Sequence, residues 1–228
     1  MQFLFKPRLL IYMSSPFLPV FLRVQNNILS SWLPDGLTKL KKLREVYLSK
    51  NGFQFDIPKY IGDMEDLEDW RVNENEMNGT IPESLYTLPK LKYLWLQDTL
   101  SCSELDSGGL DCSVDGDVGF TGSISTEIGN LKKLSWLLVN ENPLTGTLPT
   151  EIGMCEDLSV LHIHKTEIEG SSPKELCLLR DKNLNNELDQ GVFYADCRPN
   201  NKTQDPFFEC HCCSDCCDHT TKVCIQDD

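Results

Sequence analysis

The sequence is poor in positive charge. Its 228 residues include 21 lysines and arginines against 35 aspartates and glutamates, which gives a formal net charge of −14. An acidic surface repels phosphate backbones and anionic headgroups, so the composition argues against nucleic acid and anionic membranes as partners. Acidity is also ordinary for a solvated protein surface, and it identifies no partner by itself.

No apolar run in the sequence is long enough to span a bilayer. The most apolar stretch is the N-terminus, MQFLFKPRLLIYMSSPFLPVFL, in which Lys6 and Arg8 precede an apolar segment in the manner of a signal peptide. Serines and prolines between residues 14 and 19 interrupt it, and no small-x-small cleavage site is clear. We expect residues 1–21 to be a degenerate signal or N-terminal segment, and a membrane anchor only on a longer parent chain.

The sequence also lacks the patterns of common catalytic sites. It contains no nucleophile–base arrangement, phosphate-binding loop or paired-acid motif. His162 and His164 project from one face of a predicted strand, but no third metal ligand lies near them. The acidic segment at residues 101–119 does not match the calcium loop D-x-[DN]-x-[DN]-G. We therefore predict no enzymatic activity, no cofactor and no metal site.

A 24-residue repeat dominates what is present. Segments starting at Leu43 (LREVYLSKNGFQFDIPKYIGDM), Leu67 (LEDWRVNENEMNGTIPESLYTL) and Leu134 (LSWLLVNENPLTGTLPTEIGMC) share the pattern LxxLxLxxNxLxGxIPxxIGxL. Six turns start near residues 22, 43, 67, 91, 134 and 158, with a 19-residue insertion at about residues 101–119. Six turns exceed the roughly three that a solenoid needs to bury a continuous core.

The position after each predicted strand holds a polar turn residue. An asparagine there can bond the backbone groups that a bend leaves unpaired, in its own coil and in the neighbouring one. Thr99 and Thr166 offer only a hydroxyl, so we expect looser turns there. The predicted structural turn ladder consists of Asn27, Asn51, Asn75 and Asn142.

Alternation along each strand separates the core from the outer surface. We expect Trp70 to be a core residue, because it occupies an inward position. The inward residues are Leu48, Val72, Leu96, Val139 and Ile163 in one layer, and Val46, Trp70, Leu94, Leu137 and Leu161 in the next.

This repeat resembles the plant-type leucine-rich repeat, LxxLxLxxNxLxGxIPxxLGxL, over roughly residues 20–180. MNGTIPESL, FTGSISTEIGNL and LTGTLPTEIG carry the resemblance. It implies an α/β solenoid, a right-handed superhelix with a parallel sheet on its concave side and short strands and 3₁₀ turns on its convex side. It also implies an extracellular location, recognition of proteins, peptides or glycans, and no catalysis, as in receptor-like kinase ectodomains and polygalacturonase inhibitors. The family's N-terminal cap, with two cysteines and a tryptophan, has no match before Leu22, so residues 1–21 cap the first coil differently or are a truncated cap.

Eleven cysteines indicate an oxidising compartment or metal binding. Cys155 falls at an inward repeat position, where we expect a buried, unpaired thiol. Cys102 and Cys112 bracket the acidic segment CSELDSGGLDC of the insertion and predict a disulfide-closed loop. The other eight are Cys177, Cys197, Cys210, Cys212, Cys213, Cys216, Cys217 and Cys224.

The run CHCCSDCC at Cys210–Cys217 allows two interpretations. Its cysteines, with His211 and His219, can ligate zinc or copper. Disulfides are favoured, because an extracellular solenoid and an even residual count agree with them. The tail resembles the C-x-C-C-x-x-C-C ending of diatom leucine-rich repeat proteins, and the family's C-terminal caps imply a Cys177–Cys197 bond. We therefore expect a solenoid over residues 22–180 and a Cys-rich C-terminal cap over 181–228.

Two N-glycosylation sequons, at Asn78 in NGT and Asn201 in NKT, lie in predicted loops.

The outward strand residues predict a partner-binding concave face. Clustered aromatic side chains ringed by polar groups are typical of binding anchors. Aromatics also favour strands, and the insertion could cover these side chains. The candidate residues are Tyr47, Arg71, Tyr93, Trp95, Trp136, Leu138, His162 and His164.

We interpret the chain as a secreted or cell-surface binding module for an extracellular protein, peptide or glycan. Three alternatives remain open: a secreted inhibitor of a cell-wall hydrolase, a structural or adhesive wall protein, and a metal-thiolate tail on a repeat scaffold.

Overall fold

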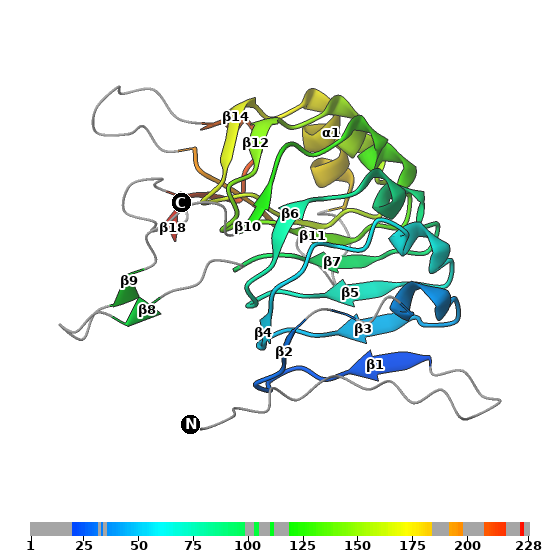
Figure 1. The fold of residues 1–228 in the computed structure, drawn as a ribbon. Helices are drawn as coiled ribbons and strands as arrows, with labels where there is room; N and C mark the ends of the chain where they lie inside the picture. The colour runs from blue at the N-terminus through cyan, green and yellow to red at the C-terminus, as the bar shows by residue number, and fades with distance from the viewer. Residues whose placement is uncertain are drawn as a thin grey trace.

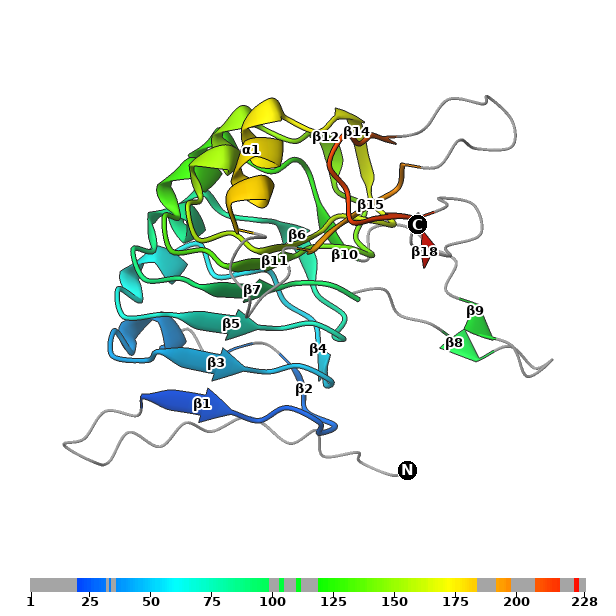
Figure 2. The same cartoon turned by 180° about the vertical axis from the view of Figure 1, so that it is seen from behind.

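Parallel strands stack one above another along the axis of a curved, right-handed solenoid (Figures 1 and 2). This computed structural model describes residues 20–31, 33, 36–98, 103–104, 110–111, 119–183, 192–197, 208–217 and 224–225. In the described part, a nine-stranded sheet lines the concave side. Its order is β1 (Phe21–Arg23), β3 (Glu45–Tyr47), β5 (Asp69–Arg71), β7 (Tyr93–Trp95), β11 (Trp136–Leu138), β13 (Val160–His162), β15 (Val192–Ala195), β17 (Asp215–Cys217) and β18 (Cys224–Ile225).

The register of this sheet follows the sequence repeat. Val46 pairs with Trp70, and Trp70 pairs with Leu94, each 24 residues on. Across the insertion, Leu94 pairs with Leu137. All neighbouring strands are parallel except the last pair, β17 and β18. Within the insertion, the described residues are Gly119 and two antiparallel strands, β8 (Ser103–Glu104) and β9 (Leu110–Asp111).

Short elements complete each coil on the other side. 3₁₀ helices occupy the convex side: η1 (Leu37–Lys39), η2 (Ile61–Asp63), η3 (Glu83–Thr87), η4 (Thr126–Asn130) and η5 (Thr150–Met154). In the described residues, three small parallel sheets are formed by strands that follow the concave strands along the chain: β2 (Ser30–Ser31) with β4 (Gly52–Phe53), β6 (Asn78–Thr80) with β10 (Gly119–Thr121), and β12 (Thr145–Thr147) with β14 (Glu167–Ser171) and β16 (Phe208–Glu209).

The α-helix α1 (Lys174–Asn183) replaces the 3₁₀ turn of the sixth coil and packs against η5. Gly153 allows this close approach, because a Cβ atom there would lie 2.4 Å from the Cβ of Glu175. In the described residues, no helix is long and apolar enough to cross a membrane.

The core confirms the predicted inward positions. Trp70 is fully buried, together with both stacked layers of aliphatic residues. Cys155 is buried and unpaired, as predicted. Its thiol lies 3.2 Å from the carbonyl oxygen of Ile128, and burial raises the pKa of this thiol to about 12. Cys155 is therefore a packing residue rather than a reactive one.

The asparagine ladder has the predicted geometry. Asn75 Nδ2 donates to the carbonyl oxygens of Val72 and Asn73 in its own coil and of Leu48 in the preceding coil. Its Oδ1 accepts from Phe53 N. Asn51 and Asn142 repeat this arrangement. The residue before each ladder position has a positive φ of 55–58°, which shapes the bend.

The ladder changes at its ends. Asn27 is exposed, and among the described residues its side-chain amide bonds only the carbonyl oxygens of Val24 and Gln25. Thr166 donates to Ile163 O at 2.6 Å and accepts from Ile168 N at 3.3 Å, both within its own coil. Thr99 lies outside the described residues.

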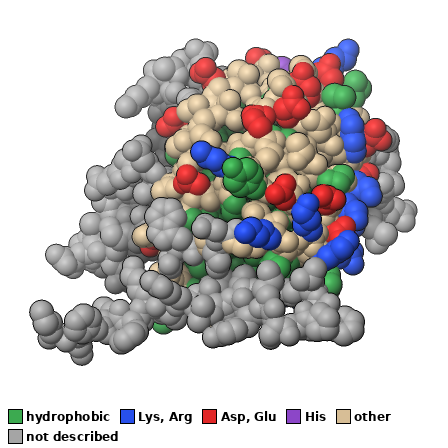
Figure 3. All heavy atoms as spheres, turned by 45° about the vertical axis from the view of Figure 1, so that its right-hand side comes forward, with side chains coloured by type: hydrophobic (Ala, Val, Ile, Leu, Met, Phe, Trp, Pro, Cys, Tyr) green, Lys and Arg blue, Asp and Glu red, His purple; other side chains and the backbone are tan. Residues whose placement is uncertain are grey.

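Charges of both signs alternate between coils where the chain enters the strands. Asp66 pairs with Lys42 at 3.1 Å and with Lys90 at 2.7 Å, and these hydrogen bonds lower the pKa of Asp66. Glu68 lies between Arg44 and Lys92 in the same way. Figure 3 shows lysines, arginines and acidic residues interspersed over this side of the molecule. The acidic excess of the chain is therefore not concentrated on this side.

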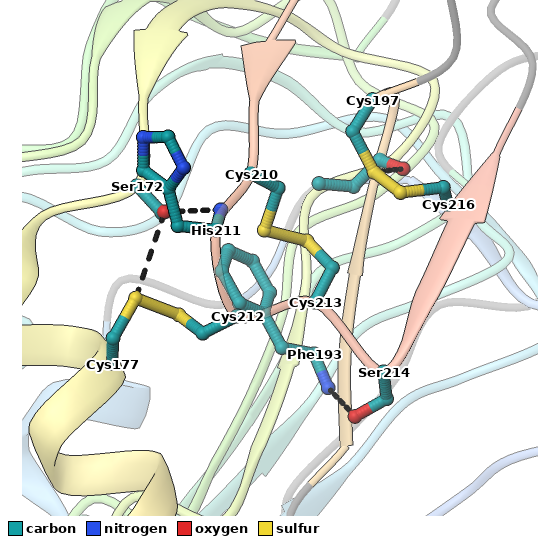
Figure 4. The surroundings of a disulfide bond; sticks show 11 residues. Ser172, Cys177, Phe193, Cys197, Cys210, His211, Cys212, Cys213, Ser214 and Cys216 are labelled. Atoms are coloured by element: carbon teal, nitrogen blue, oxygen red, sulfur yellow. Dashed lines mark hydrogen bonds between the residues drawn. A yellow bond between two sulfur atoms is a disulfide. The ribbon is translucent and has the colours of Figure 1, made fainter. Parts of the chain in front are cut away.

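The tail extends the sheet instead of ending it. β15 continues the parallel sheet beyond the sixth coil, and β17 pairs with β15. Figure 4 shows the disulfides that result: Cys177–Cys212, Cys197–Cys216 and Cys210–Cys213. The predicted Cys177–Cys197 bond is wrong. Cys197 follows a strand of the concave sheet and meets Cys216 of the paired strand, whereas Cys177 lies on α1 and meets Cys212.

Other predictions about the tail and the sequons have mixed outcomes. Cys217 and Cys224 are opposite each other in the β17–β18 pair. Asn78 is exposed but lies in strand β6, so the predicted loop is wrong there. Among the described residues, no group of three or more histidines, cysteines or acids is placed to hold a metal ion. The described residues do not include Cys102, Cys112 or Asn201.

Candidate binding face

The candidate residues lie in two adjacent rows across the concave sheet. Strand register places Tyr47, Arg71 and Trp95 side by side, followed by Leu138 and His162. In the flanking row, Asp69 is opposite Tyr93, and Tyr93 is opposite Trp136. The parallel register therefore brings side chains from five coils onto one face.

Arg71 is held between two aromatic rings. Its guanidinium carbon lies 4.5 Å from the Tyr47 ring centroid and 4.0 Å from that of Trp95, a cation–π geometry. Asp69, only 4% exposed, accepts from Arg71 Nε at 2.8 Å and from a terminal nitrogen at 2.7 Å. The Tyr47 hydroxyl donates to the same carboxylate at 2.7 Å. Arg71 is thus rigid and its charge is compensated.

The pKa shifts in this cluster agree with its geometry. The hydrogen bonds to Asp69 raise the pKa of Arg71 further above its ordinary value. Burial, and then the hydrogen bond to Asp69, raise the pKa of Tyr47 far above neutral. Arg71 is therefore charged and Tyr47 neutral throughout the physiological pH range.

Two tryptophans form the centre of the face. The rings of Trp95 and Trp136 are parallel within 1°, with centroids 5.8 Å apart on neighbouring strands. Tyr93 meets Trp136 edge to face at 5.9 Å and 86°. All three side chains are half-buried. They present a mixed ring surface of the kind that anchors a partner.

Two predicted contact residues are less accessible than expected. Leu138 is 8% exposed, because it lies in register between Trp95 and His162, whose side chains are larger. His164 is 9% exposed and packs beside His162 and Tyr194. Burial lowers the pKa of His164 to about 4, so its imidazole is neutral at physiological pH. His162 stays half-buried and stacks on Tyr194 at 4.5 Å.

Several polar atoms on this face are buried without a hydrogen-bond partner among the described residues. They are Trp95 Nε1, Gln97 Oε1, Asn140 Oδ1 and His164 Nδ1. The last three lie along one row, just beyond the ends of β7, β11 and β13. An unmatched buried polar atom costs about 1–3 kcal/mol, so a ligand that supplies the missing partners gains affinity.

A carboxylate pair lies at the strand-end border of the face. Burial, followed by the hydrogen bond and charge of Glu141, raises the pKa of Asp98 to about 7. Burial opposes ionisation of Glu141 too, but hydrogen bonds from Asp98 and Lys165 leave the pKa of Glu141 lowered. Lys165 Nζ lies 2.5 Å from Glu141 Oε1. The pair therefore shares one proton, held by Asp98, up to near-neutral pH.

Replacing Asp98 by asparagine should flatten the pH dependence of stability between pH 5 and pH 8. Because the folded-state pKa of Asp98 is raised, its contribution to stability is complete below about pH 4 and is lost as the pH rises through 7. Asp98 is only half-buried, so we expect a discounted loss of about 1 kcal/mol in the wild type. Urea unfolding of the wild type and of D98N at pH 5 and at pH 8 measures this loss of stability. Glu167→Gln, at an exposed carboxylate on β14, is the matched control, and an unchanged slope in D98N would contradict the assignment.

Comparison with known proteins gives structural neighbours only. No family model and no curated protein matches the chain. The Arabidopsis receptor kinase HAESA, solved with the peptide hormone IDA and the co-receptor SERK1, matches at TM-score 0.60 and 26% identity, over 70% of this chain and 24% of that one. The fold is a leucine-rich repeat solenoid. The leucine-rich repeat ectodomain of GASSHO1/SCHENGEN3 from Arabidopsis thaliana, in complex with CASPARIAN STRIP INTEGRITY FACTOR 2, matches at 0.58 and 26%, over 69% and 17%. The plant peptide hormone receptor RGFR1, in complex with RGF2, matches at 0.51 and 28%, over 70% and 26%.

The chain spans about a quarter or less of the length of these leucine-rich repeat receptors.

The concave face of this chain includes a residue that sequence reasoning missed. Tyr194 continues the first row on β15, next to His162. The sequence signal for this strand is the alternation of apolar Phe193 and Ala195 with Tyr194, and both apolar residues are buried in the structure. Phe193 lies 32 residues after its partner Leu161, so it falls outside the 24-residue period.

Proposed function

We propose that the chain is a non-enzymatic leucine-rich repeat binding module whose concave face contacts a protein or peptide partner outside the cell. The observation that carries this proposal is the half-buried Trp95–Trp136 pair beside the clamped Arg71. The similarity to HAESA, solved with a peptide hormone, and to the peptide hormone receptor RGFR1 supports it. A glycan could use the same rings, but the neighbours favour a peptide.

The charges of the face indicate how this partner is bound. Both arginines of the first row are already paired, Arg23 with Glu45 and Arg71 with Asp69. A charged partner would therefore find few unpaired charges on this face. The aromatic rings and the unpartnered Gln97, Asn140 and Trp95 atoms offer apolar contact and neutral hydrogen bonds instead. We expect the binding to depend weakly on salt.

The disulfides support the extracellular part of the proposal. Cys177 of α1 and five cysteines of the tail form three disulfides, which persist in oxidising compartments. Asn78 is exposed within its sequon, which agrees with glycan attachment.

Replacing Trp95 and Trp136 together by alanine should weaken binding at least about 100-fold, because each is expected to act as a hot spot of 2 kcal/mol or more. Peptides selected from a random displayed library on the wild-type protein provide the probes, and calorimetry measures their Kd. Tyr60→Ala is the matched control, since Tyr60 is exposed on the convex side. Unchanged affinity in the double variant, with unchanged circular dichroism, would sink the proposal.

Two alternative functions have their own readouts. Inhibition of a cell-wall hydrolase would be detected as saturable loss of enzyme activity. An adhesive wall protein would bind polysaccharide weakly and without saturation, and it would be insensitive to the tryptophan changes.

A further inference from the structure

The three described disulfides differ in what they connect (Figure 4). Cys177–Cys212 ties α1 to the turn between β16 and β17, over a sequence separation of 35. Cys197–Cys216 ties the end of β15 to β17, over a separation of 19. Cys210–Cys213 closes a C-x-x-C ring within that one turn. Only the third connects no two elements of the fold.

We propose that Cys210–Cys213 is a thiol–disulfide exchange site whose co-substrate is a dithiol. This inference is independent of the concave-face function. It assigns a chemical role to the C-x-x-C motif, which the binding module does not use.

Access favours attack at this disulfide. Cys210 and Cys213 pack against the core cluster on one side, but both are only half-buried, so their remaining surface is open to an external thiolate. Cys212 is only 7% exposed and belongs to the core cluster, which shields the Cys177–Cys212 bond. Cys197–Cys216 is also half-buried, but its sulfurs lie between the paired strands β15 and β17.

The surrounding contacts keep the turn in place when the Cys210–Cys213 bond opens. On one side, β16 pairs with β14; on the other, Ser214 N donates to Phe193 O at 2.9 Å, and Phe193 N donates to Ser214 Oγ at 3.1 Å. The backbone N–H of His211 donates to Ser172 Oγ at 3.0 Å. With Cys212 still bound to Cys177, the two thiols stay near each other and the bond can form again.

The exchange is a balanced two-electron step. A thiolate of the dithiol attacks one sulfur of Cys210–Cys213, and the other cysteine leaves as a thiolate. The second thiolate of the dithiol then closes on the mixed disulfide and releases the attacked cysteine. The dithiol is oxidised to a cyclic disulfide, and its two protons end on the thiols of Cys210 and Cys213.

The test is differential alkylation of the full chain. The oxidised protein is incubated with graded dithiothreitol, quenched with an alkylating reagent and mapped by peptide mass, while near-ultraviolet circular dichroism follows the fold. We expect Cys210 and Cys213 to label about tenfold faster than the other two described disulfides, with the spectrum unchanged. Cys155 is an internal standard, because it is buried and should label only on unfolding.

Two paired variants provide controls. Cys210→Ser/Cys213→Ser should lose the fast-labelling pair and keep the spectrum. Cys197→Ser/Cys216→Ser should keep the fast labelling of Cys210 and Cys213. Earlier labelling at Cys197, Cys216, Cys177 or Cys212, or opening of all three bonds together with loss of the spectrum, would overturn the proposal.

Discussion

Replacing Asn75 by alanine should lower the free energy of unfolding by about 3–5 kcal/mol, one of the largest effects expected of any single substitution in the chain. The amide is 4% exposed and makes four hydrogen bonds to backbone groups. They join the third coil to the carbonyl of Leu48 and the N–H of Phe53 in the second. Alanine leaves these groups buried without partners, and each such group costs about 1–3 kcal/mol.

Asn27 is the matched control for this prediction. It occupies the same repeat position in the first coil, bonding two carbonyls of its own coil, but it is exposed. Water can replace the amide there, so Asn27→Ala should cost less than about 1 kcal/mol. Urea unfolding of both variants measures the contrast. Equal losses would show that the ladder residues act only through local turn geometry, and not by bridging coils.

Asn75→Asp separates the donor from the acceptor function. Aspartate keeps an oxygen for Phe53 N but loses the donor to three carbonyls and places negative charge beside them. It should therefore be at least as destabilising as alanine at neutral pH. A milder effect than that of alanine would mean that the single bond to Phe53 N accounts for most of the loss.

The repeat explains why so much of the fold could be predicted from the sequence. The coils share one repeat pattern, so the position of a residue within the repeat determines its environment in each coil. The burial of Trp70 and Cys155, an aromatic ring and a thiol among aliphatic positions, follows from position alone. The bridging geometry of Asn75 and Asn142 follows in the same way.

The features that could not be predicted lie where the period fails or where neighbouring side chains decide. Tyr194 joins the face because β15 continues the sheet after a connection of a different length. The pairing of Cys177 depends on where α1 meets the turn before β17, and spacing does not contain this information. Leu138 is buried because its two neighbours in the row have larger rings, although its outward position was read correctly.

Removing the Cys177–Cys212 disulfide should destabilise the tail far more than removing Cys210–Cys213. Loop-closure entropy predicts a loss of about 4 kcal/mol for the first ring and about 2 kcal/mol for the second. The sequence separations are 35 and 3 residues. The first bond also connects α1, which covers η5, to a buried cysteine of the core. Paired alanine variants, Cys177→Ala/Cys212→Ala and Cys210→Ala/Cys213→Ala, avoid leaving free thiols.

Thermal and urea unfolding of both variants, with the wild type alongside, gives the comparison. If the loss follows ring size, the Cys177–Cys212 bond holds the last coil against the solenoid, and the C-x-x-C ring is free to open without loss of the fold. If both variants lose the same free energy, the contacts around Cys210 and Cys213 stabilise the tail as much as the larger ring does. In that case the fold of the tail depends on the smaller ring as much as on the larger one, which contradicts an exchange at Cys210–Cys213 that leaves the fold unchanged.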